Sequence, residues 1–292
     1  MGVEVYSATS VRNEAKMKRS VWIIVVAALA FGIGLFSPLG ATRAGAQDWA
    51  SAKLEKSPRH REWVKVRHGK RVVDTFVVYP QAKDKRPVVL VIHEIFGLTD
   101  WAQLVADEIA EQGYIAVEPD LLSGMGPHGG RTTSFTQQQA IEAVSNLNPE
   151  QITADLNAAA NYALKLPASN GKLFVVGFCW GGGQSFRYAT NRRGLKAAFV
   201  FYGTPPPAEA MKRIAAPVYG FYAENDERVS STIPETQKEM KALGKVYEAV
   251  VYKGAGHGFM RAGEAPNATD ANSDARKQAW MRFKVLLEEH DQ

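Results

Sequence analysis

The chain has 292 residues, 46% of them hydrophobic and 22% charged, which is enough apolar material for a substantial globular core. Its formal net charge is +5, but residues 1–46 carry five basic and two acidic side chains, so the remainder holds 30 Lys and Arg against 28 Asp and Glu. This near balance excludes the strongly basic surface typical of nucleic-acid-binding proteins, and we expect no nucleic-acid partner.

The N-terminal segment has the pattern of a secretory signal peptide. A basic start at Met17-Lys18-Arg19-Ser20 precedes an apolar run over residues 21–36, which is short for a membrane span, and the small residues 44–46 follow. We expect translation from Met17, cleavage after Ala46 and a periplasmic or secreted protein. The alternative is an uncleaved anchor, which would hold the protein at a membrane.

The rest of the chain alternates strand-like and helix-like segments. In chain order we predict a hairpin over residues 62–67 and 71–79, strands over 87–92, 114–117, 172–176, 197–202, 218–222 and 246–251, and helices over 100–112, 149–166, 231–243 and 274–289. Strands that alternate with helices predict an α/β fold, with a mostly parallel central sheet and helices on both faces.

Two segments fall outside this alternation. Residues 47–60 are expected to be a linker that leads into a single domain over residues 61–292. Residues 121–148 are rich first in glycine and then in glutamine, and they are too long for an ordinary connection. We predict that they form an insertion or lid that faces the substrate.

Cys179 is the only cysteine, and it lies between Gly177 and Gly181, after the apolar run of residues 173–176. This G-x-C-x-G spacing is typical of a nucleophile elbow, where glycines leave room for a tight strand-to-helix turn. The N-terminus of the following helix favours a thiolate and a developing oxyanion. The alternative is a buried structural cysteine. A lone thiol in an exported chain favours the nucleophile.

Residues suited to chemistry lie at the ends of the predicted strands, where parallel sheets place their active sites. These residues are His93, Glu94, Pro119, Asp120, Cys179, Tyr202, Asp226 and His257. After a nucleophile elbow, an acid and then a histidine should follow along the chain, and Asp226 and His257 do so on successive loops. Glu224 is a rival for the acid role.

The segment His93-Glu94-Ile95-Phe96-Gly97 follows the first buried strand. It is not the zinc-binding H-E-x-x-H motif, because Gly97 occupies the fifth position. Such a loop supplies one backbone N–H of an oxyanion hole, which we assign to Ile95, while Trp180 supplies the other. A carboxylate at Glu94 would oppose an oxyanion, so Glu94 needs a different role.

Together these motifs resemble the dienelactone hydrolase (carboxymethylenebutenolidase) family. The likeness rests on residues 93–98, residues 177–182, the loop that contains Asp226 and residues 256–259, and it extends over roughly residues 60–290. The resemblance implies an α/β-hydrolase fold and a hydrolase that acts on ester bonds. It also implies a Cys-His-Asp triad and no metal or organic cofactor.

The resemblance further implies two charged residues in the site. The family glutamate that matches Glu94 contacts the resting thiol and moves away when substrate binds, which helps to form the thiolate. The family arginine that binds a substrate carboxylate is matched by Arg261, so the expected substrate is anionic. The family's second substrate arginine has no counterpart in residues 121–125, and Arg131 is the nearest candidate.

We therefore predict an exported hydrolase of small lactones or carboxylic esters, which forms a thioester acyl-enzyme at Cys179. One alternative is a carboxylesterase or thioesterase of broad specificity, whose pocket is shaped by residues 121–148. Another is a non-catalytic ligand-binding protein that keeps the fold. An intact set of nucleophile, acid and base argues against a mere binder, which has no use for all three.

Overall fold

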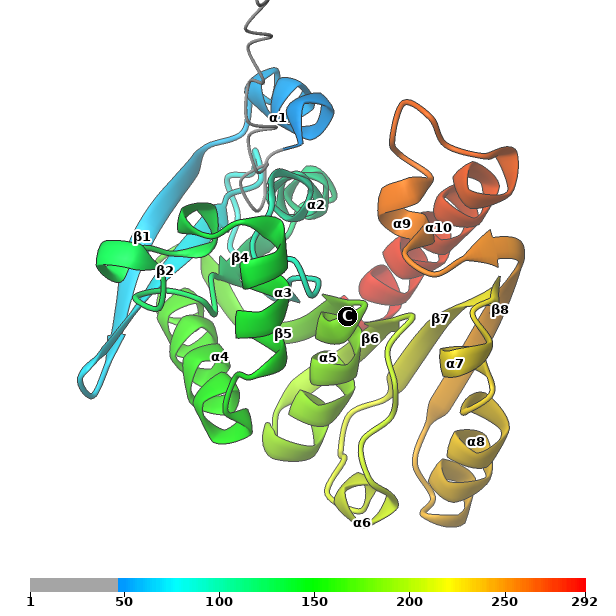
Figure 1. Ribbon diagram of the computed structural model, residues 1–292. Coiled ribbons are helices and arrows are strands. Elements are labelled where there is room, and N and C mark those ends of the chain that lie inside the picture. The colour runs from blue at the N-terminus through cyan, green and yellow to red at the C-terminus, as the bar shows by residue number, and fades with distance from the viewer. Residues whose placement is uncertain (1–46) are drawn as a thin grey trace, which may run out of the picture. The chain divides into compact units, whose positions relative to one another are not determined.

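The computed structural model describes residues 47–292, so the predicted signal peptide lies outside the described residues. A central sheet of eight strands separates two layers of helices (Figure 1). The strands are β1 (Arg61–His68), β2 (Arg71–Val78), β3 (Arg86–Ile92), β4 (Ile115–Pro119), β5 (Ser169–Phe178), β6 (Leu195–Phe201), β7 (Val218–Asn225) and β8 (Tyr247–Gly256). Every predicted strand is present, and the α/β fold class is confirmed.

The strands lie in the order β1-β2-β4-β3-β5-β6-β7-β8. Only β2 runs antiparallel to its neighbours β1 and β4, and all the other pairs are parallel. The predicted hairpin is therefore confirmed at one edge of the sheet. Because the parallel strands share one direction, their carboxyl ends bring Glu94, Cys179, Asp226 and His257 to the same edge.

Ten α-helices occur among residues 47–292, and the four predicted helices are among them. They are α1 (Asp48–Glu55), α2 (Asp100–Glu111), α3 (Gln137–Ser145), α4 (Pro149–Leu164), α5 (Trp180–Asn191), α6 (Ala208–Met211), α7 (Glu227–Ser230), α8 (Ile233–Ala242), α9 (Phe259–Ala262) and α10 (Asp270–Asp291). Helix α1 corrects the predicted linker over residues 47–60. Its Ala50 and Leu54 are buried, because α1 packs against α2.

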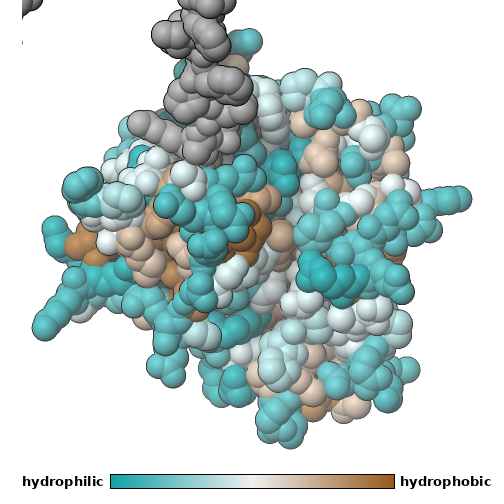
Figure 2. Space-filling model, viewed as in Figure 1, coloured by the Kyte–Doolittle hydropathy of each residue, from teal (hydrophilic) through white to brown (hydrophobic). Residues whose placement is uncertain are grey.

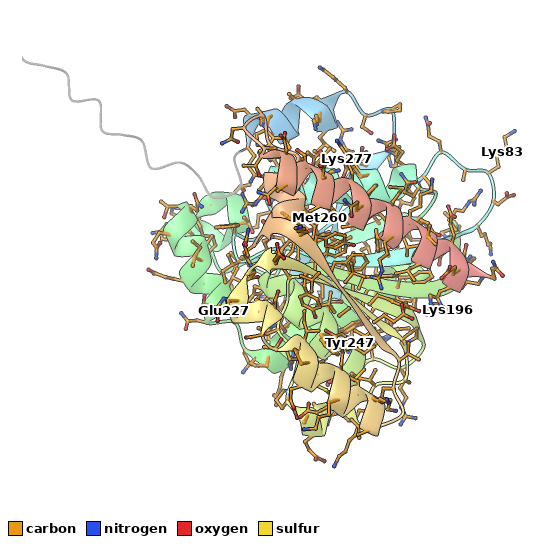
Figure 3. All side chains as sticks on the ribbon, turned by 90° about the vertical axis from the view of Figure 1, so that its right-hand side faces the viewer. Lys83, Lys196, Glu227, Tyr247, Met260 and Lys277 are labelled. Atoms are coloured by element: carbon orange, nitrogen blue, oxygen red, sulfur yellow. The ribbon has the colours of Figure 1, made fainter. Side chains whose placement is uncertain are left out.

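Each face of the sheet has its own apolar core. On one side α2 and α10 bury Trp101 and Phe283 against Phe199 and Phe201 of the sheet. On the other side α4, α5 and α8 bury Leu156, Phe186 and Met240. Short helix α9 places Met260 beneath α10 (Figure 3). Burying one such large side chain contributes roughly 1.5–3 kcal/mol, so the two cores together hold the sheet rigid.

The surface seen in Figure 2 is mainly hydrophilic, with hydrophobic residues in small separate patches. The exposed large apolar side chains include Met281 and Val285, which lie one turn apart on α10. No helix within residues 47–292 combines the length and the apolar character needed to cross a membrane.

Residues 121–148 are more ordered than a simple irregular loop. After the short 3-10 turns η1 (Pro127–Gly129) and η2 (Thr132–Ser134), helix α3 begins at a capping box formed by Thr136 and Gln139. Buried residues of this insertion pack against Ile95 and Trp180. The insertion therefore forms part of the wall around the strand ends.

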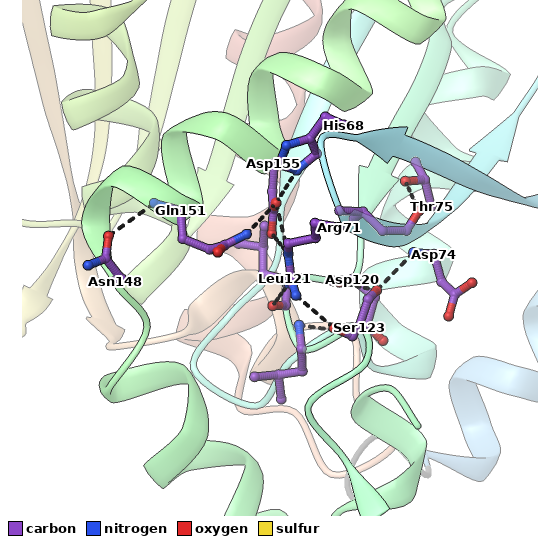
Figure 4. A network of polar contacts seen from close by, with 12 residues as sticks. His68, Arg71, Asp74, Thr75, Asp120, Leu121, Ser123, Asn148, Gln151 and Asp155 are labelled. Atoms are coloured by element: carbon purple, nitrogen blue, oxygen red, sulfur yellow. Dashed lines mark hydrogen bonds and ion pairs between the residues drawn. The ribbon is translucent and has the colours of Figure 1, made fainter. Parts of the chain in front are cut away.

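A partly buried polar network fixes the start of this insertion (Figure 4). The Asp155 carboxylate, from α4, lies 2.8 Å from Nε of Arg71 and 2.6 Å from Nε2 of His68. The Arg71 guanidinium also donates to the backbone carbonyls of Leu121 and Ser123. Asp155 thus links the β1–β2 hairpin and α4 to the loop after β4.

We expect Asp155→Ala to destabilise the fold by about 3 kcal/mol, because it leaves the Arg71 charge partly buried without its carboxylate. The measurement is urea unfolding followed by circular dichroism. Asp84→Ala is the matched control, since the Asp84 side chain is 87% exposed and lies 3.9 Å from its arginine partner. Equal unfolding midpoints for the two variants would show that the network does not contribute to the stability of the fold.

Candidate active site

Cys179 lies at a strained turn between β5 and α5. Its backbone has φ 56° and ψ −118°, a conformation that residues other than glycine rarely adopt. A Cβ atom at Gly177 would lie 1.9 Å from the carbonyl oxygen of Gly181, and one at Gly181 would lie 2.3 Å from the carbonyl oxygen of His93. Both glycines are therefore required by close backbone contacts. Strain of this kind at a reactive side chain is typical of functional sites.

A hydrogen-bonded chain joins Cys179 to the predicted histidine and acid. Nε2 of His257 lies 3.1 Å from Sγ of Cys179, and Nδ1 of His257 lies 2.5 Å from Oδ2 of Asp226. An ionised Asp226 only accepts hydrogen bonds, so Nδ1 carries the ring proton and the Nε2 lone pair faces the thiol. The rival Glu224 instead accepts a hydrogen bond from the backbone N–H of Gly254 and does not contact His257.

The backbone N–H groups of Trp180 and Ile95 are close enough to the sulfur to lower the pKa of the thiol. These are the two groups predicted for the oxyanion hole. Trp180 is the first residue of α5, whose N-terminal dipole end adds to the positive potential there. An oxygen bound next to the sulfur would thus meet two preorganised donors.

Burial dominates the ionisation of the thiol. Burial and, to a smaller extent, the nearby charge of Glu94 raise the pKa of Cys179 to about 11, while the two N–H groups and Arg228 oppose this rise. The resting site therefore holds a neutral thiol at physiological pH. A thiolate would form only if another group accepted the proton, and Nε2 of His257 is the adjacent acceptor.

Glu94 is buried, and its Oε2 lies 2.7 Å from Nε of Arg261. Burial raises the pKa of Glu94, and the charge of Arg261 opposes that rise. The structure thus pairs the two charged residues that the family resemblance singled out. The hydrogen-bond partner of the thiol here is His257, while Glu94 is held by Arg261. Arg131, the other candidate, stacks its guanidinium 3.4 Å from the centre of the Trp63 ring.

Two further residues support the site. His93 is fully buried, and its Nδ1 lies 2.8 Å from the carbonyl oxygen of Glu94, while its ring stacks on Trp180. Burial lowers the pKa of His93 to about 4, so it is neutral and holds the loop of Ile95 in place. Tyr202 has φ 39°, and its ring lies edge-on to His257. Only their positions at strand ends pointed to them in the sequence.

The insertion is tied to the same loop by a buried carboxylate. Asp120 accepts hydrogen bonds from the backbone N–H and the hydroxyl of Thr132. The Thr132 hydroxyl oxygen in turn accepts from the N–H of Leu98. Among residues 47–292, no three His, Cys, Asp or Glu side chains are grouped so as to hold a metal ion.

Comparison with known proteins assigns this chain to a protein family. The sequence profile described as the dienelactone hydrolase family matches residues 73–291. A candidate carboxymethylenebutenolidase of Salmonella typhi is 31% identical over 216 residues, 70% of this chain and 78% of that protein. One from Methylorubrum extorquens is 30% identical over 225 residues, 73% of this chain and 75% of that protein.

Solved structures give the same result for the fold. A candidate dienelactone hydrolase from Klebsiella pneumoniae superposes with a TM-score of 0.68 at 25% identity, over 78% of this chain and 98% of that one. A dienelactone hydrolase-like promiscuous phosphotriesterase from metagenomic libraries superposes with a TM-score of 0.67 at 23% identity, over 79% and 98% of the two chains. The predicted α/β-hydrolase fold is confirmed.

We expect Glu94→Gln to lower the pKa of the Cys179 thiol, because the charge of Glu94 raises that pKa. The measurement is the rate of alkylation by iodoacetamide across pH, and the single cysteine makes the reaction specific. Glu224→Gln is the control, since Glu224 is exposed and contacts neither the thiol nor His257. An unchanged or raised midpoint in Glu94→Gln would contradict the electrostatic account.

Proposed function

This chain belongs to the dienelactone hydrolase family and is a hydrolase that acts on ester bonds, and we propose that Cys179 is its nucleophile. In this proposal the enzyme cleaves small carboxylic esters or lactones through a thioester acyl-enzyme, with His257 as base and Asp226 as the acid that orients it. The observation that carries the proposal is the hydrogen-bonded chain Asp226–His257–Cys179, next to two convergent backbone N–H groups.

The first half of the reaction forms the acyl-enzyme. As the sulfur attacks the carbonyl carbon, its proton passes to Nε2 of His257, which lies 3.1 Å away. The carbonyl oxygen becomes an oxyanion that the N–H groups of Ile95 and Trp180 stabilise. The C–O bond then breaks, and the imidazolium returns its proton to the departing alcohol oxygen, which leaves a thioester on Cys179.

The second half releases the acid. A water molecule gives a proton to His257 as its oxygen attacks the thioester carbonyl, and the same two N–H groups hold the new oxyanion. When the C–S bond breaks, the sulfur recovers the proton from the imidazolium. Asp226 keeps the ring oriented throughout and stabilises its charged form, because its carboxylate lies 2.5 Å from Nδ1.

Glu94 and Arg261 adjust this chemistry. A free carboxylate beside the oxyanion hole would oppose the charge that develops there, and the Arg261 guanidinium neutralises it. In the proposal, the pair keeps the thiol protonated at rest without leaving a net negative charge next to the reacting carbonyl.

Export is a second part of the proposal. It rests on the basic start at Met17, the apolar run over residues 21–36 and the small residues before Gln47. In an exported enzyme the single thiol would work outside the reducing cytoplasm. Its high pKa suits that environment, because the thiol form reacts slowly with oxidants.

Cys179→Ala should abolish hydrolysis of para-nitrophenyl acetate, because no other thiol exists in the chain. His257→Ala should reduce kcat by at least about 10³-fold, and Asp226→Asn should reduce it less, since the base remains in place. Mass spectrometry of the rapidly quenched enzyme should find an acetyl group on the peptide that contains Cys179.

Glu224→Gln is the matched control for Asp226→Asn, because both carboxylates lie at the end of β7 and only one contacts His257. It should keep wild-type activity. Turnover that survives in Cys179→Ala would refute the nucleophile. A wild-type protein that hydrolyses no ester or lactone would favour the ligand-binding alternative.

The export proposal predicts a processed chain. When the full sequence is produced in a bacterium with a periplasm, the protein released from that compartment should begin at Gln47. Intact mass and N-terminal sequencing measure this directly. Ala46→Arg should block processing, because the cleavage site requires small residues. A wild-type protein that stays in the cytoplasm with its N-terminus intact would contradict export.

A further inference from the structure

A cavity of about 460 Å³ opens beside Cys179. It lies between α5, the loop of residues 203–207 and the start of α7, whose first residue, Glu227, is labelled in Figure 3. Its apolar walls come from Ile95, Trp180 and the three prolines 205–207. A cavity of this size holds a small organic group, and the consecutive prolines keep one wall rigid.

The charged side chains that line this cavity are all positive. Its polar lining consists of Gln184, Arg187, Tyr202, Thr204 and Arg228, so two guanidinium groups are present and no carboxylate is. A cavity with only cations and neutral polar groups attracts an anion. Arginine binds a carboxylate in a two-pronged geometry, which adds specificity to the charge attraction.

Arg228 and Tyr202 are available for such a ligand. Within residues 47–292, Arg228 makes no ion pair or hydrogen bond, although its charge is close enough to lower the pKa of Cys179. The Tyr202 hydroxyl is buried and lacks a hydrogen-bond partner in the described part of the chain. Arg187 bonds only neutral groups, the Thr153 and Gln184 side chains and the carbonyl of Pro149. Its charge is therefore not neutralised by a direct ion pair.

The other arginines near the site are engaged elsewhere. Arg261 is paired with the buried Glu94 and also lies over the Phe96 ring. Arg131 is stacked on Trp63. Neither of them lines this cavity. Among the described residues, the positive charge near Cys179 that makes no ion pair thus lies on the α7 side. It is separate from Arg261, the arginine that the family resemblance assigns to substrate binding.

The position of His257 decides which part of a substrate enters the cavity. The leaving alcohol must reach Nε2 of His257 to receive a proton, yet His257 does not line the cavity, whereas Cys179, Ile95 and Trp180 do. The leaving group therefore lies outside, toward His257. The acyl part, which stays bonded to the sulfur, points into the cavity.

On this basis we propose that Arg228, with Arg187 at the cavity wall, binds a carboxylate on the acyl part of the substrate. The substrate class is then a half-ester of a dicarboxylic acid, or a lactone that carries a carboxylate on its acyl side. The inference rests on the proposed function, since it takes Cys179 as the atom that receives the acyl group.

The experiment compares two esters with the same leaving group and acyl chain length, mono-para-nitrophenyl adipate and para-nitrophenyl hexanoate. Wild type should prefer the charged ester in kcat/KM. Arg228→Gln should lower the ratio of the two kcat/KM values roughly 10- to 100-fold, mainly through KM of the adipate ester. Arg228→Lys should recover part of the ratio, because it keeps the charge and loses the two-pronged contact.

Two arginine variants serve as controls. Arg193→Gln alters an exposed arginine just beyond the far end of α5 and should leave both rates unchanged. Arg261→Gln tests the other side of the site. If the preference for adipate collapses in Arg261→Gln and survives in Arg228→Gln, the carboxylate is bound by Arg261 and the proposal is wrong. An equal loss on both esters in Arg228→Gln, or no preference in wild type, also overturns it.

A binding measurement separates this inference from the catalytic proposal. Adipate should bind the Cys179→Ser protein in calorimetry, and the additional change Arg228→Gln should weaken that binding by a similar factor. Hydrolysis that persists in Cys179→Ala would refute the nucleophile while leaving this result intact. Failure of adipate to bind, or equal binding with and without Arg228, would refute the carboxylate site while leaving cysteine-dependent hydrolysis intact.

Discussion

The active site depends on how closely helix α5 approaches the carboxyl ends of β3, β5 and β6. A Cβ at Gly181 would lie 2.3 Å from the carbonyl oxygens of Ile92 and His93, at the end of β3, and one at Gly182 would lie 2.4 Å from the carbonyl oxygen of Phe201. Only backbone without side chains fits there, so the helix N-terminus reaches the strand ends and carries Cys179 with it. The proposed oxyanion hole depends on the same contact, because Ile95 lies in the loop after β3 and Trp180 is the first residue of α5.

The site contains charged groups of both signs, which oppose one another. Burial and Glu94 raise the pKa of the thiol, and Arg261 forms an ion pair with Glu94, which in the proposed mechanism prevents Glu94 from opposing an oxyanion. His257 is the only hydrogen-bond partner of the sulfur among the described side chains. If Cys179 is the nucleophile, as proposed, its reactivity is coupled to the arrival of a carbonyl group, because burial and Glu94 disfavour the thiolate at rest. Such coupling would limit unproductive alkylation and oxidation of the lone cysteine.

Most of the sheet could be predicted, because strands buried on both faces are continuous runs of Val, Leu, Ile and Phe. The tight turn at Cys179 and the proximity of Cys179, His257 and Asp226 could be predicted from glycines and chain order. Helix α1 could not, since its burial depends on α2 rather than on its own weakly apolar sequence. Helix α3 had a local signal in the Thr136–Gln139 capping box, but its glutamine-rich composition obscured it. The cavity at Arg228 could not be foreseen, because loops far apart in the chain form it.

The contact between Gln47 and helix α2 lies directly beside the proposed cleavage site. The backbone nitrogen of Gln47 lies 2.8 Å from a carboxylate oxygen of Asp100, and the Gln47 side chain accepts a hydrogen bond from the N–H of Trp101. If cleavage occurs after Ala46, this nitrogen becomes a free α-ammonium group that faces Asp100 directly. Removal of the leader would then convert a neutral hydrogen bond into an ion pair, and the mature chain end would be fastened to the start of α2.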